Sequence, residues 1–274
     1  MRPQQLEAVI ISVNFADMLS LTLPKNKRHF DNIVVITDEN DRETVNVCRD
    51  ENVNCYSTDA FYYKGAKLNK GLAINVGFKH LKYRSWIGNL DADIILDENF
   101  REKFDSFATD IECSYSSRRY DVPTYQEWLE IERNQELLKT KKLYRGIGYG
   151  NNFFFHYRSE VFQTLIDATK GLPYPCAFNN VATSDWIFRN FWSNWIYDPP
   201  LNDDPNQHAI EHNDHAERPD DLKELPFYAI HLGETGKNES GRATPKFGET
   251  PQFRPKSRVI PEIAPEFEIT TIKI

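Results

Sequence analysis

Four short, largely apolar runs in the first part of the chain constrain the fold most strongly. They are AVIISV (8–13), NIVVIT (32–37), NVNCYS (52–57) and SWIGNL (85–90). Such runs are typical of strands whose two faces are both covered, as in a parallel sheet. Longer stretches separate them, and NKGLAINVGFKHL (69–81) has the apolar pattern of a helix. Strands alternating with such segments predict an α/β, Rossmann-like sheet flanked by helices.

The second half of the chain is less regular. Its patterns predict an amphipathic helix at 123–144, a helix at 159–169, the start of another in 183–195 and a buried strand at 151–157. Residues rich in Asp, Asn, Pro and His predict an exposed loop from Pro199 to Glu224. The prolines after Pro245 predict an extended tail that wraps the body.

Composition excludes several classes of protein. A chain of 274 residues with 40% hydrophobic residues can bury a large core, and we expect one domain over 1–274. The formal charge of −8 gives no global reason to bind nucleic acid or an anionic membrane. The N-terminal apolar run is too short for a signal or membrane segment, so we expect a cytoplasmic protein, in the host cytoplasm if the source is a virus. The four cysteines form no CxxC pair, which predicts buried thiols.

Two carboxylates follow the fourth predicted strand, in the stretch NLDADIIL. Asp91 and Asp93 stand at i and i+2, so on an extended segment both point to the same side. Carboxylate oxygens suit hard divalent ions such as Mg²⁺ or Mn²⁺, which bind through one or two carboxylates plus substrate phosphates. A pair of solvated turn acids is the alternative, because a bare DxD is common by chance.

Several motifs in one order resemble those of the GT-A glycosyltransferases, the enzymes that transfer a sugar from a nucleotide-sugar. LDADIIL resembles their DxD motif, and AKLNKGLAINVGFKHL resembles the segment upstream of it in galactosyltransferase-like members. ATSDWIFRNFW and AIHLGETGKNESGR stand where that family has its acceptor-side helix start and its late metal-binding histidine. The resemblance covers roughly residues 8–245. It implies a GT-A, mixed but mostly parallel sheet, with a nucleotide-binding half (1–100), an acceptor half (101–245) and a tail (246–274).

The resemblance implies a divalent-metal site. Asp93 would be the principal ligand of Mn²⁺ or Mg²⁺, and Asp91 would contact the metal or the ribose. His231 would complete the coordination, although a polar loop histidine is the alternative. The ion would neutralise the charge that develops on the leaving nucleoside diphosphate.

Further residues are candidates for donor contacts. Asn14 and Asp38 follow the first two predicted strands and would contact the base or ribose, or else form an Asx turn or a helix cap. Basic groups beside a diphosphate stabilise its charge. The remaining candidates for the donor phosphates are Lys67, Asn69, Lys70, Lys237 and Arg242, with solvent-exposed lysines as the alternative at 67 and 70.

Asp185 is the candidate general base. An inverting enzyme needs a carboxylate to take the proton of the acceptor hydroxyl, and Asp185 stands at a predicted helix start beside Trp186. In a retaining enzyme it would orient the acceptor, and Ser184 with Asp185 could instead cap the helix. The cluster of His208, His212 and His215 lies in a polar loop that we interpret as solvated rather than metal-binding.

The acceptor is not determined by the sequence. We expect a UDP-sugar donor and a hydroxyl-bearing acceptor such as a glycan. Hydroxymethylated DNA is the alternative acceptor, because six basic residues stand against three glutamates between residues 232 and 258. A nucleotidyltransferase or a phosphotransferase could also use an α/β sheet and paired aspartates, but we find no GxxxxGK(S/T) loop and no glycine-rich fingerprint after the first predicted strand. A sugar- or nucleotide-binding module without catalysis also remains open, as does the oligomeric state.

Overall fold

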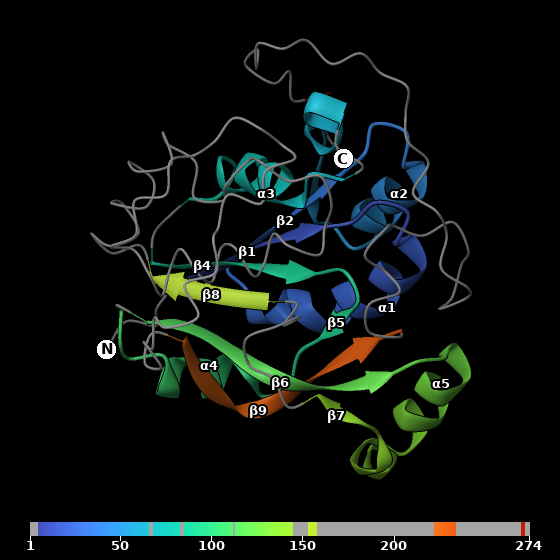
Figure 1. The fold of residues 1–274 in the computed structure, drawn as a ribbon, viewed down its shortest axis with the longest axis vertical. Coiled ribbons are helices and arrows are strands. Elements are labelled where there is room, and N and C mark those ends of the chain that lie inside the picture. The colour runs from blue at the N-terminus through green and yellow to red at the C-terminus, as the bar shows by residue number, and fades with distance from the viewer. Residues whose placement is uncertain are drawn as a thin grey trace.

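The chain folds around one mixed β-sheet with helices on both faces (Figure 1). The structure is a computed structural model, and it describes residues 5–65, 68–82, 85–111, 113–144, 153–157, 222–233 and 270–271. In these residues the strands are β1 (Leu6–Ile11), β2 (Asn32–Thr37), β3 (Asn54–Ser57), β4 (Trp86–Asp91), β5 (Ile94–Ile95), β6 (Ser114–Val122), β7 (Leu143–Tyr144), β8 (Phe153–Tyr157), β9 (Leu222–Leu232) and β10 (Thr270–Thr271). The helices are α1 (Ala16–Asn26), α2 (Arg42–Asp50), α3 (Lys70–Phe78), α4 (Phe100–Phe107) and α5 (Tyr125–Arg133), with 3₁₀ turns η1 (Lys27–His29), η2 (Ala60–Gly65) and η3 (Gln135–Thr140).

The predicted parallel strands are confirmed. Strands β3, β2, β1 and β4 lie side by side in that order, and each neighbouring pair is parallel. The observed bounds differ from the predicted ones by at most two residues at either end. This half of the sheet has the Rossmann-like arrangement, in which ligands bind beyond the carboxyl ends of the strands.

The rest of the sheet is mixed. Strand β8 pairs antiparallel with β4 and β6, while the long strand β9 pairs parallel with β6 and antiparallel with β5. Strands β7 and β10 add short antiparallel pairs to β6 and β3. The predicted α/β class with a mixed, Rossmann-like sheet is therefore confirmed, but the parallel pairing is concentrated in the N-terminal half.

Alternate residues of the central strands supply two hydrophobic layers. Leu6, Ala8 and Ile10 of β1 pack in one cluster with α1, α2 and α4. Val9 and its counterparts on β2 pack on the opposite face against α3 and η2. Because neither face meets water, both sets of side chains are apolar, which is why the sequence has near-continuous apolar runs.

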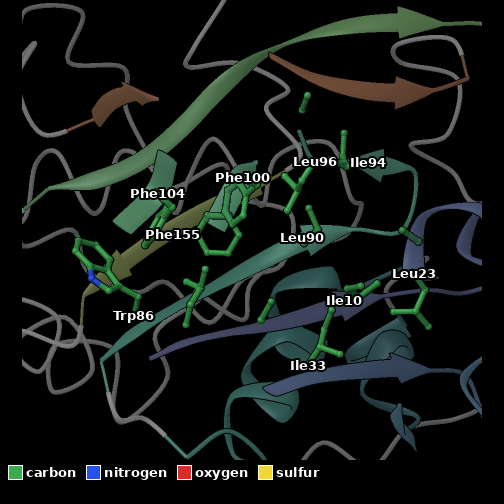
Figure 2. Packing of buried hydrophobic residues seen from close by; sticks show 14 of the residues in the cluster. Ile10, Leu23, Ile33, Trp86, Leu90, Ile94, Leu96, Phe100, Phe104 and Phe155 are labelled. Atoms are coloured by element: carbon green, nitrogen blue, oxygen red, sulfur yellow. The ribbon is translucent and has the colours of Figure 1, made fainter. Parts of the chain in front are cut away.

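A cluster of aromatic side chains fills the space between α4 and the sheet (Figure 2). Phe100 and Phe104 of α4 pack against Phe155 of β8, with ring centroids 5.5 and 5.6 Å apart. Trp86 of β4 meets Phe104 edge-to-face at 5.3 Å. These rings fix β8 against β4 and thereby join the two predicted halves of the chain.

The single helix predicted over 123–144 is wrong. Helix α5 ends at Arg133, a 3₁₀ turn follows, and residues 143–144 form β7. Asn134 is the reason: its extended backbone (φ −145°, ψ 94°) closes α5, and its side chain accepts a hydrogen bond from the Glu136 N–H to start η3. Trp128 and Ile131 of α5 are buried against the body of the protein.

Other expectations fall partly outside the described residues. The predicted helices at 159–169 and 183–195 and the loop from Pro199 to Glu224 lie there, apart from the last residues of that loop, which begin β9. Cys48, Cys55 and Cys113 are buried free thiols, as expected. In the part of the chain that the structure describes, no helix is long and apolar enough to cross a membrane.

Gly77 sets the distance between α3 and the sheet. A Cβ atom built on Gly77 would lie 2.8 Å from Cγ2 of Val9, closer still to its Cγ1, and 3.1 Å from Cγ1 of Ile36. We predict that Gly77→Ala destabilises the protein by about 1 kcal/mol or more, because overpacking outweighs the gain in helix propensity. Urea unfolding measures this. Lys79→Ala, at the exposed end of the same helix, is the control, and an unchanged stability of Gly77→Ala would contradict the close packing.

Buried His29 predicts a loss of stability in acid. Burial, with the nearby Arg28 charge, lowers the pKa of His29 from 6.5 to about 4. Between these values the unfolded chain binds a proton that the folded chain does not, so stability falls as the pH falls. We predict that wild type loses about 2 kcal/mol more than His29→Leu between about pH 7 and about pH 5. Urea unfolding at both pH values tests this, and equal losses in the two proteins would contradict it.

Candidate functional site

The turn between β4 and β5 carries Asp91 and Asp93 at the carboxyl edge of the parallel strands. Strand β4 ends at Asp91, and β5 begins at Ile94. Ala92 is buried between the two acids. The turn therefore lies where an open α/β sheet binds its ligands, as the sequence predicts.

Helix α1 holds this turn through two buried polar side chains. The hydroxyl of Thr22 donates to the Ala92 carbonyl at 2.7 Å. Asn26, one helical turn further on, donates from Nδ2 to the Ile94 carbonyl at 2.7 Å and accepts from the Leu96 N–H at 2.9 Å. Both side chains are fully buried, so these bonds replace water for three main-chain groups of the turn.

Strand β9 brings His231 to the same place. In its antiparallel pair with β5, His231 stands opposite Ile94. The N–H of Leu232 donates to the Asp93 carbonyl at 2.8 Å. In the parallel pair with β6, His231 is in register with Asp121. His231 is thus fixed by main-chain pairing on both sides.

The imidazole of His231 lies between two carboxylates. Its Nε2 is 3.5 Å from Oδ2 of Asp93, and its Nδ1 is 3.1 Å from Oδ1 of Asp121. The contact to Asp121 is an ion pair that lacks the alignment of a hydrogen bond. Arg119 Nε lies 3.3 Å from the same Asp121 oxygen. All four side chains are buried, so their charges interact with little screening by water.

Electrostatics favour the charged forms of this pair. Burial alone would lower the pKa of His231, but the Asp93 charge and the contact with Asp121 outweigh burial and raise it. Burial alone would raise the pKa of Asp93, but the charge and contact of His231, together with the nearby charges of Arg119 and Lys70, outweigh burial and lower it. In the absence of a ligand, imidazolium and carboxylate therefore stabilise each other.

Asp91 pairs with Lys70. The Lys70 ammonium lies 2.7 Å from Oδ1 of Asp91, and the Lys70 side chain is 4% exposed against 21% for Asp91. Lys70 is thus a buried cation rather than a solvated surface lysine. Asn69 precedes it as the N-cap of α3, where its side chain accepts from the Leu72 N–H at 2.9 Å. The cap places Lys70 in the first turn of α3, close to Asp91.

The ends of β1 and β2 meet through Asp41. Asn14 is exposed and left-handed (φ 62°), and its N–H donates to Oδ2 of Asp41 at 2.7 Å. Asp41 also caps α2. Asp38 is buried and accepts from the N–H and Nδ2 of Asn40, the Asx turn that the sequence left open. The contacts of Asn14 and Asp38 with a base or ribose stay predictions.

The structure brings only part of the predicted site together. Asp91, Asp93, His231, Asn69 and Lys70 lie around the carboxyl end of β4 and the start of α3, and Asn14 and Asp38 follow the neighbouring strands. Four other candidates are outside the described residues: Lys67, Asp185, Lys237 and Arg242. The cluster of His208, His212 and His215 also lies outside them.

A divalent ion fits the donor set at Asp93 and His231. A buried carboxylate oxygen and an imidazole nitrogen face each other, and both are ligands that Mn²⁺ accepts once it displaces the proton from His231 Nε2. Among the described residues, no three His, Cys, Asp or Glu side chains are already arranged to hold a metal. Asp91, Asp93 and His231 are therefore not a preformed triad. Mg²⁺-type sites draw further ligands from water and substrate phosphates, so two protein donors are sufficient for such an ion.

Sequence reasoning missed four residues that build the site. Arg119 and Asp121 are on β6, which was not predicted, although charges at i and i+2 in an otherwise buried segment mark one face of a strand. Thr22 and Asn26 are polar residues at i and i+4 on the buried side of α1. Buried polar residues at strand or helix spacing are the signal that could have found both pairs.

Comparisons with known proteins give a likeness of fold. No protein-family model matches the sequence, and no curated protein matches it. A glucosyl-3-phosphoglycerate synthase from Mycobacterium tuberculosis, solved with Mg²⁺ and UDP, is 11% identical with a TM-score of 0.46, over 88% of this chain and 73% of that one. A mycobacterial protein is 13% identical with a TM-score of 0.40, over 62% of this chain and 63% of that one.

A third solved structure is also among the matches. It is a 4-diphosphocytidyl-2C-methyl-D-erythritol synthase from Anaerococcus prevotii, 13% identical with a TM-score of 0.34, over 44% of this chain and 58% of that one. The chain thus spans less than two thirds of two of these three proteins. At such identities and scores, these likenesses assign neither substrate nor catalytic residues to this chain.

The contact between α1 and the acidic turn predicts a specific effect of Asn26→Ala. This substitution leaves the buried Ile94 carbonyl and Leu96 N–H without Asn26, so we expect the protein to lose about 3 kcal/mol of stability. We also expect faster amide hydrogen exchange at Leu96. Urea unfolding and exchange measured by NMR test both effects. Asn134→Ala, at an exposed 3₁₀ cap, is the control, and unchanged exchange at Leu96 would contradict the role of Asn26.

Proposed function

We propose that the protein is a metal-dependent glycosyltransferase that moves a sugar from a nucleotide-sugar to a hydroxyl acceptor. The observation that supports this most directly is the contact between His231 and Asp93 at the carboxyl edge of the sheet, 3.5 Å apart and buried. The sequence predicts these two residues as metal ligands from motifs far apart in the chain. Their meeting is what that function requires.

Asp93 and His231 would hold the divalent ion in the proposed reaction. When bound, the ion supplies Lewis-acid neutralisation of the charge on the leaving nucleoside diphosphate. The carboxylate of Asp93 and Nε2 of His231 would face it, while main-chain pairing with β5 and β6 keeps the histidine in place. Neither side chain has to move a proton to or from the sugar.

Lys70 and Asp91 would contact the nucleotide-sugar donor. The ion pair at 2.7 Å fixes the carboxylate of Asp91, which we assign to the ribose or the metal. Lys70 adds a positive charge at the same edge of the sheet, and a diphosphate in this region would be stabilised by it. Asn69 supports this arrangement as the helix cap. Asn14 and Asp38 remain our candidates for the base and ribose, with Lys67, Lys237 and Arg242 as further phosphate contacts.

Asp185 is our candidate for the group that activates the acceptor. In an inverting reaction its carboxylate would accept the hydroxyl proton as the acceptor attacks the anomeric carbon. The class of acceptor follows from the sequence only in outline. We propose a glycan or another hydroxyl compound, with hydroxymethylated DNA as the alternative and a UDP-sugar as the donor.

The first test is calorimetric titration of UDP, GDP and ADP into the protein with Mn²⁺, and again with EDTA. We expect one of these nucleotides to bind tightly only when Mn²⁺ is present. Screening of the corresponding nucleotide-sugars for hydrolysis or transfer then identifies the donor. Absence of metal-dependent binding by every nucleotide would contradict the proposed function.

Asp93→Asn tests the site itself. The substitution keeps the volume of the side chain and removes its charge, so we expect Mn²⁺-dependent nucleotide binding and sugar transfer to be lost. Asp97→Asn changes a neighbouring carboxylate that pairs with Lys103, and is the control expected to retain both. Normal metal affinity and transfer in Asp93→Asn would show that the ion is held elsewhere.

A further inference from the structure

A buried row of charged side chains runs from β6 through β9 to the acidic turn. Arg119 contacts Asp121, Asp121 contacts His231, and His231 contacts Asp93, over 3.3, 3.1 and 3.5 Å. None of the four is more than 6% exposed. The proposed function uses only the last two members, which leaves the buried pair of Arg119 and Asp121 without a role.

Backbone pairing fixes where Asp121 can act. Asp121 and His231 are register partners in the parallel pair of β6 and β9, so their side chains emerge beside each other. The pairing continues past them, because the N–H of Gly233 donates to the Val122 carbonyl at 2.8 Å. The Asp121 carboxylate therefore meets Nδ1, the ring nitrogen that does not face Asp93.

We propose that Asp121 is a positioning residue, whose charge beside Nδ1 holds the His231 ring with Nε2 directed at Asp93. The inference rests on the proposed function, in which Nε2 and Asp93 hold a divalent ion. A histidine that binds a metal through one nitrogen commonly has its other nitrogen beside a carboxylate, which fixes the ring orientation. Here the Nδ1 of His231 and the Asp121 carboxylate are not aligned for a hydrogen bond, so Asp121 acts mainly through its negative charge.

Arg119 completes the arrangement. Its Nε lies 3.3 Å from the same Asp121 oxygen that contacts His231, so it offsets the cost of burying that carboxylate. This makes the simplest variant ambiguous. In Asp121→Asn, the buried Arg119 would lose the carboxylate charge that lies 3.3 Å from its Nε, and the protein would lose stability for a reason unrelated to metal binding.

The test therefore uses two variants, Asp121→Asn and the double variant Arg119→Met with Asp121→Asn. The double variant removes both charges and should recover the stability that the single variant loses. Affinity for Mn²⁺ with the nucleotide identified above is measured by calorimetry. Binding of the histidine is followed separately by the nitrogen coupling in the electron spin echo spectrum of Mn²⁺. Asp105→Asn, which breaks an aspartate–arginine pair on α4, is the control.

If Asp121 positions His231, both variants bind Mn²⁺ about tenfold or more weakly, and the nitrogen coupling is reduced even where stability has recovered. The control variant keeps wild-type affinity and coupling. If the double variant recovers affinity and coupling together with stability, the role of Asp121 is structural and the inference is overturned.

The same measurements separate this inference from the proposed function. If the wild-type protein binds no Mn²⁺ with any nucleotide, both the proposed function and the role of Asp121 are contradicted. The other outcome is that the wild-type protein binds Mn²⁺ with a histidine nitrogen coupling and Asp121→Asn has the same affinity and coupling. That result would contradict only the role of Asp121.

Discussion

The pairing of β9 with β5 and β6 is the interaction on which the candidate site depends. It places His231 opposite Ile94 on one side and beside Asp121 on the other. Without it, the acidic turn would carry two carboxylates and no imidazole. Backbone hydrogen bonds set the register, and a shift of one residue would turn His231 to the other face of the sheet. The chemistry of the site is thus a consequence of strand register.

Burial gives these contacts their strength and also their cost. Three acids and three basic groups meet at one edge of the sheet, namely Asp91, Asp93, Asp121, Lys70, Arg119 and His231. Removing such charges from water is unfavourable unless each has a partner. The observed ion pairs meet this condition, and they differ in which residue each basic group contacts. Lys70 holds Asp91 directly, whereas Arg119 reaches His231 only through Asp121.

Helix α1 links the acidic turn to the rest of the nucleotide-binding half. Its Thr22 and Asn26 hold the turn, and its first residues follow the loop that contains Asn14. That loop is tied to Asp41, which caps α2. Hydrogen bonds of α1 and of Asp41 therefore connect the ends of β1, β2 and β4. These are the three strand ends at which the sequence predicts donor contacts.

The sequence by itself determined the parallel strands, the helix before β4 and the place of Asp91 and Asp93 at a strand end. These features depend on local periodicity, which one segment carries alone. The tertiary structure decided which acid meets which base, that Lys70 is buried, and that Asp121 stands behind His231. It also ended α5 at Asn134, where the amphipathic pattern continues but the backbone turns. Pairings between distant strands leave no local pattern, because their register is set by contacts that form only when the whole sheet assembles.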